Sequence, residues 1–199
     1  MSRGGCEDIS SVEGRTHHLG LQIGVGQLMD SRSPLSQDVT EQTIVGSHPS
    51  VPAVIDGDTT AFAADAGIEI VLENIEDGNP ADRKALVESF ASDALKLSID
   101  TGHAHYAHGI CNAPPVDYYV KSAGNLLAHV HLQDADAHAD RHWSIGRGSI
   151  HWHAVFDALA KLDAYPRLIL ELKNRAEIPA SMAWLEAEGL GVTKIRMAK

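Results

Sequence analysis

The chain has 199 residues, of which 44% are hydrophobic and 22% charged, and its formal net charge is −11. This length is sufficient to bury a core, and one globular domain is the default expectation. The acidic balance disfavours nucleic acid as a partner, because phosphate binding requires a basic surface. No run of about 18 apolar residues and no signal-peptide core is present, which favours a cytoplasmic protein that does not enter the membrane.

Residues 1–40 lack a clear periodicity and are expected to form a poorly defined segment, in which 19–29 is a glycine-diluted strand candidate. From 41 to 199, the pattern predicts one domain in which strands and helices alternate. The predicted strands are 42–47, 68–72, 95–99, 126–132 and 167–170. The predicted helices are 52–66, 81–94, 116–122, 151–162 and 178–188, and 106–115 is predicted to be a loop.

This alternation predicts parallel strands joined by helical crossovers, either as an open doubly wound sheet or as a (β/α)8 barrel. Polar residues favour the barrel, because they fall at or just after the C-terminal ends of several different strands. These residues are Glu73, Asp100, His103, His131 and Glu171. The chain has neither a G-x-G-x-x-G after a first strand nor a Walker-type loop, which argues against an open nucleotide-binding sheet.

The stretch from 126 to 150 has the most distinctive composition. Four histidines and three aspartates lie between His129 and His142. Imidazole and carboxylate together suit zinc, manganese or iron better than calcium. The alternative is a histidine-rich surface loop. We interpret the histidines at 105, 108, 138, 151 and 153 as solvent or loop residues, and we expect Trp143 to form a wall of the barrel mouth.

Five short motifs occur in order along the predicted strand ends. They are L-E-N at 72–74, D-T-G-H at 100–103, H-V-H-L-Q-D at 129–134, D-R-H at 140–142 and L-E-L at 170–172. Together they resemble the xylose isomerase-like TIM-barrel superfamily, over roughly residues 43–190. That superfamily contains sugar-phosphate isomerases and epimerases, ketose 3-epimerases and endonuclease IV.

The resemblance implies a divalent metal in the barrel mouth, namely Mn²⁺, Zn²⁺, Co²⁺ or Mg²⁺. The ligands that it implies are Glu73, Asp100, His131 and Glu171. It also implies a second group that binds substrate or a further metal, made of His103, Asp140, His142 and, by the loosest correspondence, His48.

Two departures from the family pattern are visible. A complete barrel usually needs about 250 residues, so we expect an α/β barrel that is incomplete at its N-terminus, with five or six strands. Open sheet edges would then favour a homo-oligomer. The family also commonly has Glu between the two glycines that here flank Arg147.

The expected function is a divalent-metal-dependent isomerase or epimerase of a small sugar or sugar phosphate. A metal with open positions can polarise the carbonyl of a hydroxy ketone and stabilise the enediolate formed on proton loss. Glu73 and Glu171 come from distant strands and are the candidates for general base and acid. The alternatives are an endonuclease IV-like phosphodiesterase acting on abasic DNA and a truncated barrel without activity.

Overall fold

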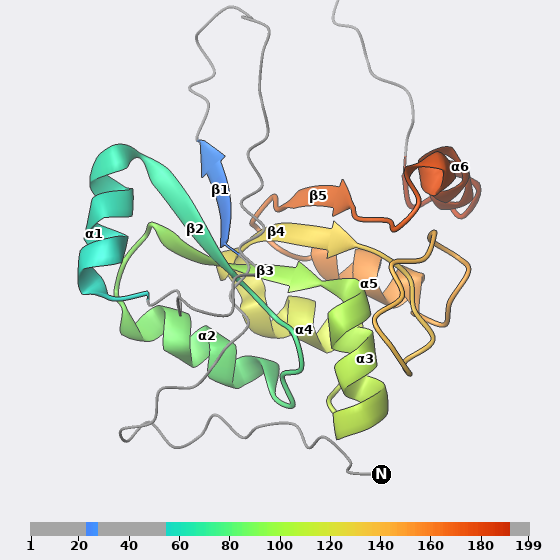
Figure 1. Ribbon diagram of the computed structural model, residues 1–199, viewed down its shortest axis with the longest axis horizontal. Helices are drawn as coiled ribbons and strands as arrows, with labels where there is room; N and C mark the ends of the chain where they lie inside the picture. Colours follow the sequence, from blue (N-terminus) through green and yellow to red (C-terminus); the bar gives the residue numbers. More distant parts are fainter. Residues whose placement is uncertain (1–22, 28–54, 192–199) are drawn as a thin grey trace, which may run out of the picture.

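The computed structural model describes residues 23–27 and 55–191, and its centre is one five-stranded sheet (Figure 1). The strands are β1 (Ile23–Gln27), β2 (Ile68–Glu73), β3 (Leu95–Asp100), β4 (Leu127–Leu132) and β5 (Arg167–Leu170). They follow one another across the sheet in chain order. β2 to β5 are parallel, whereas β1 is antiparallel to β2. The four parallel strands with their helices form half of a barrel, which confirms the predicted fold class.

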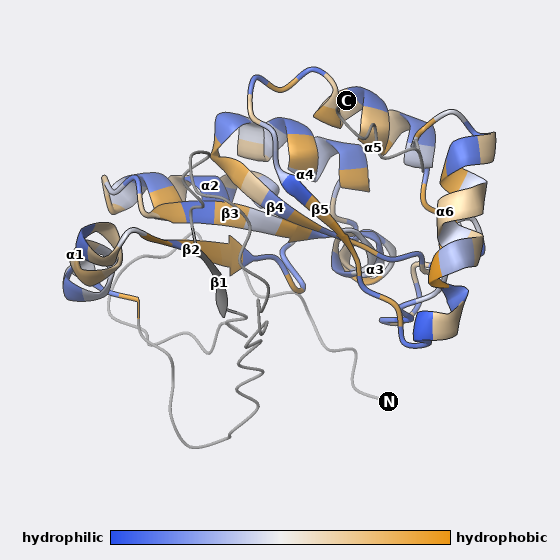
Figure 2. Ribbon diagram, turned by 90° about the horizontal axis from the view of Figure 1, so that it is seen from above, coloured by the Kyte–Doolittle hydropathy of each residue, from blue (hydrophilic) through white to orange (hydrophobic). Residues whose placement is uncertain are grey.

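The helices are α1 (Gly57–Ala66), α2 (Pro80–Ser89), α3 (Thr101–Cys111), α4 (Val116–Ala123), α5 (Trp152–Leu159) and α6 (Ile178–Ala187). Two single 3-10 turns, η1 (Gly124–Leu126) and η2 (Arg175–Glu177), complete the elements. α2, α4 and α5 lie side by side on one face of the sheet (Figure 2). They supply the crossovers that parallel strands require.

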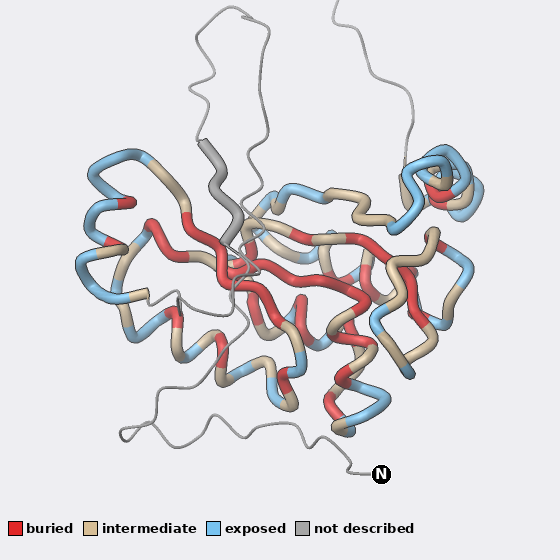
Figure 3. The backbone as a smooth tube through the Cα atoms, viewed as in Figure 1, coloured by how far each residue is buried: buried red, intermediate tan, exposed pale blue. Residues whose placement is uncertain are grey.

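The two faces of the parallel strands differ in chemistry, because successive side chains of a strand point to opposite faces. The face toward the helices carries Ile70, Leu72, Leu97, Ile99 and Val130, which all belong to the hydrophobic core. Figure 3 shows that buried residues run along the central strands of the sheet. The register aligns Glu73 with Ser98 and His129 on neighbouring strands, and Asp100 with His131. The opposite face therefore collects polar groups near the strand ends.

Several helices are shorter than the sequence predicted. α1 begins at Gly57 and not at 52, because Asp56 forms its N-cap and accepts a hydrogen bond from the Thr59 amide. α2 ends at Ser89 and not at 94, and Ala91 has a φ of +47°, which does not continue a helix. α5 covers Trp152–Leu159 only.

The loop predicted at 106–115 was wrong, because α3 covers most of it. The carboxylate of Asp100 caps this helix by accepting a hydrogen bond from the His103 amide at 2.8 Å. Ala104 and Ala107 have no exposed surface and pack into the core. Small buried residues between the histidines stabilise this helix through tertiary packing. A search for an amphipathic pattern of large apolar residues does not detect such a helix.

The strand candidate at 19–29 is present as β1. Against the predicted five or six strands, the described residues hold five, of which four are parallel barrel strands and β1 is antiparallel. The strand predicted at 42–47 and His48 lie outside the described residues. No helix in the described part of the chain is long and apolar enough to cross a membrane.

Candidate metal centre

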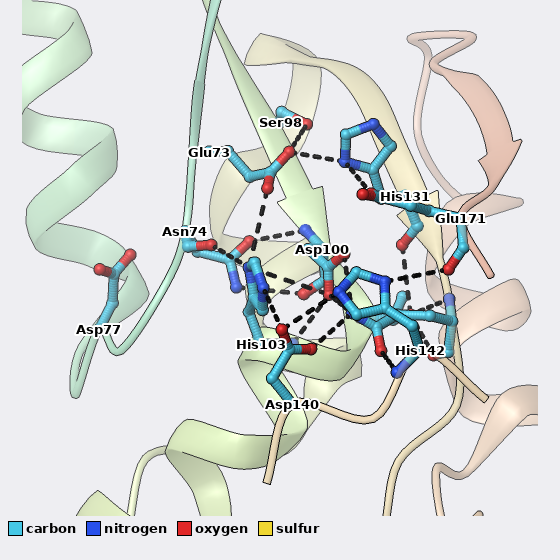
Figure 4. Close-up of polar contacts among 12 residues, drawn as sticks. Glu73, Asn74, Asp77, Ser98, Asp100, His103, His131, Asp140, His142 and Glu171 are labelled. Atoms are coloured by element: carbon cyan, nitrogen blue, oxygen red, sulfur yellow. Dashed lines mark hydrogen bonds and ion pairs between the residues drawn. The ribbon is translucent and has the colours of Figure 1, made fainter. Parts of the chain in front are cut away.

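The four predicted ligands come together at the C-terminal ends of β2 to β5 (Figure 4). Glu73 and Asp100 end β2 and β3, His131 lies near the end of β4, and Glu171 directly follows β5. The His131 Nδ1 atom is 2.7 Å from Glu73 Oε2 and 3.0 Å from Glu171 Oε2. Ligand atoms of Glu73, Asp100 and His131 all lie within 4.8 Å of one another. Three consecutive strands thus bring one imidazole and two carboxylates together, and Glu171 after β5 joins them through its contact with His131.

Three buried atoms of this cluster have no hydrogen bond of acceptable geometry. They are Glu73 Oε1, His131 Nδ1 and Glu171 Oε2. Buried polar atoms are nearly always satisfied, so such a group calls for an explanation. A divalent cation between the carboxylates and the imidazole would satisfy it, and this donor set suits Zn²⁺ or Mn²⁺. The residues present therefore fit a metal.

The electrostatics of the cluster point the same way. Burial disfavours the charged imidazole, yet the carboxylates of Glu171 and Glu73 outweigh this and raise the pKa of His131 to about 10. The contact with His131 lowers the pKa of Glu171, whereas burial raises the pKa of Asp100. The excess negative charge thus attracts a positive partner, which can be a proton or a metal cation.

Two neighbouring side-chain amides fix Asp100, one through its backbone and one through its carboxylate. The Asn74 side chain accepts a hydrogen bond from the Asp100 amide at 2.8 Å and donates one to the Asp100 carbonyl at 3.1 Å. Gln133 Nε2 donates to both carboxylate oxygens of Asp100, at 3.0 and 3.2 Å. Asn74 and Gln133 lie within the L-E-N and H-V-H-L-Q-D motifs, but the sequence alone indicated no role for them.

Ser98 is a residue that the sequence analysis missed. Its hydroxyl donates to Glu73 Oε2 at 3.3 Å and lies 3.2 Å from His129 Nδ1. Strand alternation was the available signal, because Ser98 precedes Asp100 by two residues and therefore shares its face. Burial and the neighbouring His131 lower the pKa of His129 to about 4, so its imidazole is neutral.

His103, Asp140 and His142 form a second cluster next to the first. Asp140 Oδ2 is 3.1 Å from His142 Nε2 and 3.6 Å from His103 Nε2. His103 Nδ1 also lies 3.7 Å from Glu73 Oε1, and Gln133 Nε2 donates to Asp140 Oδ1 at 3.0 Å. The two clusters are therefore continuous, and the Gln133 amide links their carboxylates.

The pKa values of both histidines in this second cluster are raised to about 9. For His142 the main cause is its hydrogen bond with Asp140. For His103 burial works against protonation, but Asp140 and Asp100 outweigh it. The same contacts overcome partial burial and hold the pKa of Asp140 far below its usual range.

The interpretation of His105 as a solvent or loop residue was wrong. His105 lies in α3 with 8% of its surface exposed, and its Nε2 is 2.8 Å from Ser149 Oγ. The helix that replaces the predicted loop turns this side chain inward. His108, His138, His151 and His153 are exposed, in agreement with the prediction.

Residues 53–188 match the protein-family model described as "Xylose isomerase-like TIM barrel". An uncharacterized protein of Methanocaldococcus jannaschii is 28% identical over 116 residues, which are 55% of this chain and 41% of that protein.

Two solved structures with similar folds share more than a quarter of their aligned residues with the chain. A D-tagatose 3-epimerase-like protein has a TM-score of 0.57 and 26% identity, covering 67% of this chain and 52% of its own. A protein of Thermus thermophilus, studied by soaking with ZnCl2, has a TM-score of 0.53 and 27% identity, covering 69% of this chain and 51% of its own. The chain spans about half the length of the proteins it matches.

Proposed function

Because the chain belongs to the xylose isomerase-like TIM-barrel family, we propose that it is a divalent-metal-dependent isomerase or epimerase of a small sugar. The observation that carries the proposal is the buried group of ligand atoms on Glu73, His131 and Glu171, which lie at ion-pair distance around the imidazole but form no hydrogen bond of acceptable geometry. The similarity to a D-tagatose 3-epimerase-like structure supports the choice of reaction class.

Glu73, Asp100, His131 and Glu171 would hold the metal. When bound, it would supply Lewis acidity toward the adjacent carbonyl and hydroxyl oxygens of a hydroxy ketone. Asn74 and Gln133 fix Asp100 through short hydrogen bonds, and such outer partners keep ligands oriented. The chain thus presents a preorganised ligand set.

Glu73 and Glu171 are the proposed proton-transfer pair. Glu73 lies on β2 and Glu171 directly follows β5, the two outer strands of the parallel part of the sheet, so the two carboxylates approach His131 from different sides. Removing a proton from one side of a carbon and returning it on the other requires two such groups. Glu171 is ionised near neutral pH, because His131 lowers its pKa, which suits it to accept the first proton.

His103, Asp140 and His142 are proposed to orient substrate hydroxyls or to hold a further metal. His103 is fixed because its Nδ1 lies 3.0 Å from the Asn74 carbonyl oxygen, while its Nε2 faces Asp140. His142 is fixed by the Glu171 carbonyl, 3.2 Å from its Nδ1. Both imidazoles therefore present one nitrogen toward the shared carboxylate.

This second cluster also keeps the alternative of an endonuclease IV-like phosphodiesterase open, because that branch uses more than one metal. The net charge of −11 disfavours a DNA substrate. The remaining alternative, a barrel without activity, predicts that no sugar is converted.

The test is a metal analysis of the purified chain together with a screen for epimerisation of ketoses. His131→Ala should lose the metal while the circular dichroism spectrum is retained, and the exposed His153→Ala is the matched control. Stoichiometric metal in the His131→Ala variant would contradict the proposed centre.

Glu171→Gln tests the chemistry, because an amide cannot exchange the proton. This variant should lose incorporation of solvent deuterium into the substrate, whereas the exposed Glu188→Gln should not. Deuterium incorporation at the wild-type rate in Glu171→Gln would exclude its role in proton transfer.

A further inference from the structure

A hollow of about 250 Å³ opens beside the candidate metal centre. Asp140 and His142 belong to both, so the two spaces adjoin. The rest of its wall consists of the ring of Trp143, the amide of Asn174, the carboxylate of Glu177 and three cationic side chains, Arg141, Arg147 and Lys173. Only ten lysines and arginines lie between residues 55 and 191 of this acidic chain, and three of them line this one hollow, where they outnumber the two carboxylates of Asp140 and Glu177.

We propose that this hollow binds a phosphoryl group, and that the sugar converted at the adjacent metal centre is a phosphate ester. The second half of this inference rests on the proposed function, whereas the first half stands on the hollow alone. The shared chemistry is a compact phosphoryl oxyanion, whose source is a sugar phosphate or, under the alternative function, a nucleic-acid backbone.

The three cations differ in how far they are already neutralised. Arg141 makes hydrogen bonds of 2.9 to 3.2 Å with the Asp136 carboxylate. The contact of Arg147 with Glu177 is longer, at 3.9 Å. Within the described part of the chain, the Lys173 ammonium has no ion pair. Arg147 and Lys173 are therefore the two cations best able to accept a new anionic partner.

The Trp143 ring positions the guanidinium groups without using their N–H donors. The Arg147 Cζ atom is 4.8 Å from the ring centroid, and the Arg141 Cζ atom is 5.3 Å from it. A guanidinium held over an aromatic face keeps the N–H groups at its edge available for two parallel bonds to phosphate. Trp143 also lines the hollow itself.

The turn that carries Arg147 is built to a fixed shape. Asp134, which is 1% exposed, accepts hydrogen bonds from the amides of Gly146 and Ile150 at 2.8 and 3.3 Å. Gly146 has a φ of +85°, and a Cβ at Gly148 would lie 2.2 Å from the Ala135 carbonyl oxygen. Arg147 therefore occupies the one position of the G-R-G turn that tolerates a side chain.

The charge at position 147 decides whether this turn attracts or repels an anion in the hollow. An acidic residue there would repel a phosphate, whereas Arg147 together with Lys173 attracts it. The two cations stand on loops that follow different strands, β4 and β5. A phosphoryl group with three acceptor oxygens can bridge such loops, and a neutral sugar hydroxyl gains less from two cations.

The experiment measures binding of glycerol 3-phosphate to the full chain by calorimetry, after a chelator has removed metal. Chelation ensures that a metal does not provide the anion site, so the result is independent of the proposed catalysis. We expect saturable binding that weakens with added salt. Arg147→Gln and Lys173→Gln should each weaken it about five- to tenfold, as expected for loss of one charge-assisted hydrogen bond at a half-exposed site.

Arg175→Gln is the matched control, because Arg175 is an exposed cation two residues from Lys173 that does not line the hollow. It should bind the probe like the wild type. Thermal melts of all three variants should coincide with that of the wild type, because all three side chains are at the surface. No saturable binding by the wild type, or equal binding by Arg147→Gln and the wild type, would overturn the phosphoryl site.

Two further measurements, made on metal-loaded protein, identify the source of the phosphate. Turnover of a ketose phosphate that exceeds turnover of the free ketose, and that Arg147→Gln reduces, supports the sugar phosphate. Incision of an abasic-site duplex without ketose turnover would overturn the sugar-phosphate assignment and the proposed function together. Turnover of free ketose alone would overturn this inference and leave the proposed function intact.

Discussion

Replacing Asp134 by Ala should destabilise the protein more than any exposed charge change. The buried carboxylate accepts four hydrogen bonds, from the amides of Ala135, Gly146 and Ile150 and from Trp152 Nε1, at 2.8 to 3.3 Å. Each bond to a charged acceptor is worth about 1.5–3 kcal/mol. The cost of burying the carboxylate offsets part of that sum, but its removal leaves buried N–H donors without an acceptor, and each such donor costs about 1–3 kcal/mol.

The assay is urea denaturation followed by circular dichroism, with Asp136→Ala as the control. Asp136 lies two residues away and forms a partly exposed ion pair with Arg141, a type of contact that contributes about 0–1 kcal/mol. The free energy of unfolding should therefore fall by about 3–5 kcal/mol in the first variant, because several buried donors lose their acceptor, and by under about 1 kcal/mol in the second. Equal losses in the two variants would refute the view that Asp134 holds the turn.

Two further stability predictions follow from close contacts. Gly102→Ala places a Cβ 2.3 Å from the Gln133 side chain, so we expect thermal melts to show a loss of stability of about 1–3 kcal/mol. Because Gln133 holds Asp100, calorimetry should also show weaker metal binding. An unchanged metal affinity would contradict this link. Arg83→Ala leaves Asp77 buried without its partner, both being 7% exposed, and should cost about 3–5 kcal/mol in urea denaturation. The exposed Lys84→Ala is its control and should cost under about 0.5 kcal/mol; similar losses in both variants would contradict the importance of the buried pair.

The sequence predicted the central strands well because each is a short apolar run that ends in a polar residue. Ile68–Glu73 and Leu95–Asp100 both show this pattern, and the observed strands extend the predictions by one residue each. The prediction failed for α3, where Gly102, Gly109 and three histidines dilute any apolar stripe. Helix formation there depends on the Asp100 cap and on packing against the sheet, which are tertiary effects.

The candidate site was predictable to the extent that strand ends converge. Glu73, Asp100, His131 and Glu171 follow from that rule, and the structure brings them together. The role of Gln133 did not follow, because an amide shows no periodic or titratable signal until Asp100 and Asp140 are seen on either side of it. The hollow beside Arg147 depends on how the loops after β4 and β5 fold, and spacing in the sequence does not specify that.

The arrangement of the ligands separates metal binding from turnover. All four proposed ligands come from the four consecutive parallel strands, so the described half-barrel holds the complete set. Under the proposed function, metal affinity would depend on these strand ends and on Asn74 and Gln133, which fix Asp100. Turnover also requires a surrounding that excludes water and confines the sugar on the side opposite the ligands. If the chain binds metal through His131 but converts no ketose, the proposed centre would be intact and the surrounding that turnover requires would be lacking. If the chain shows neither metal binding nor turnover, the proposed centre itself would be wrong.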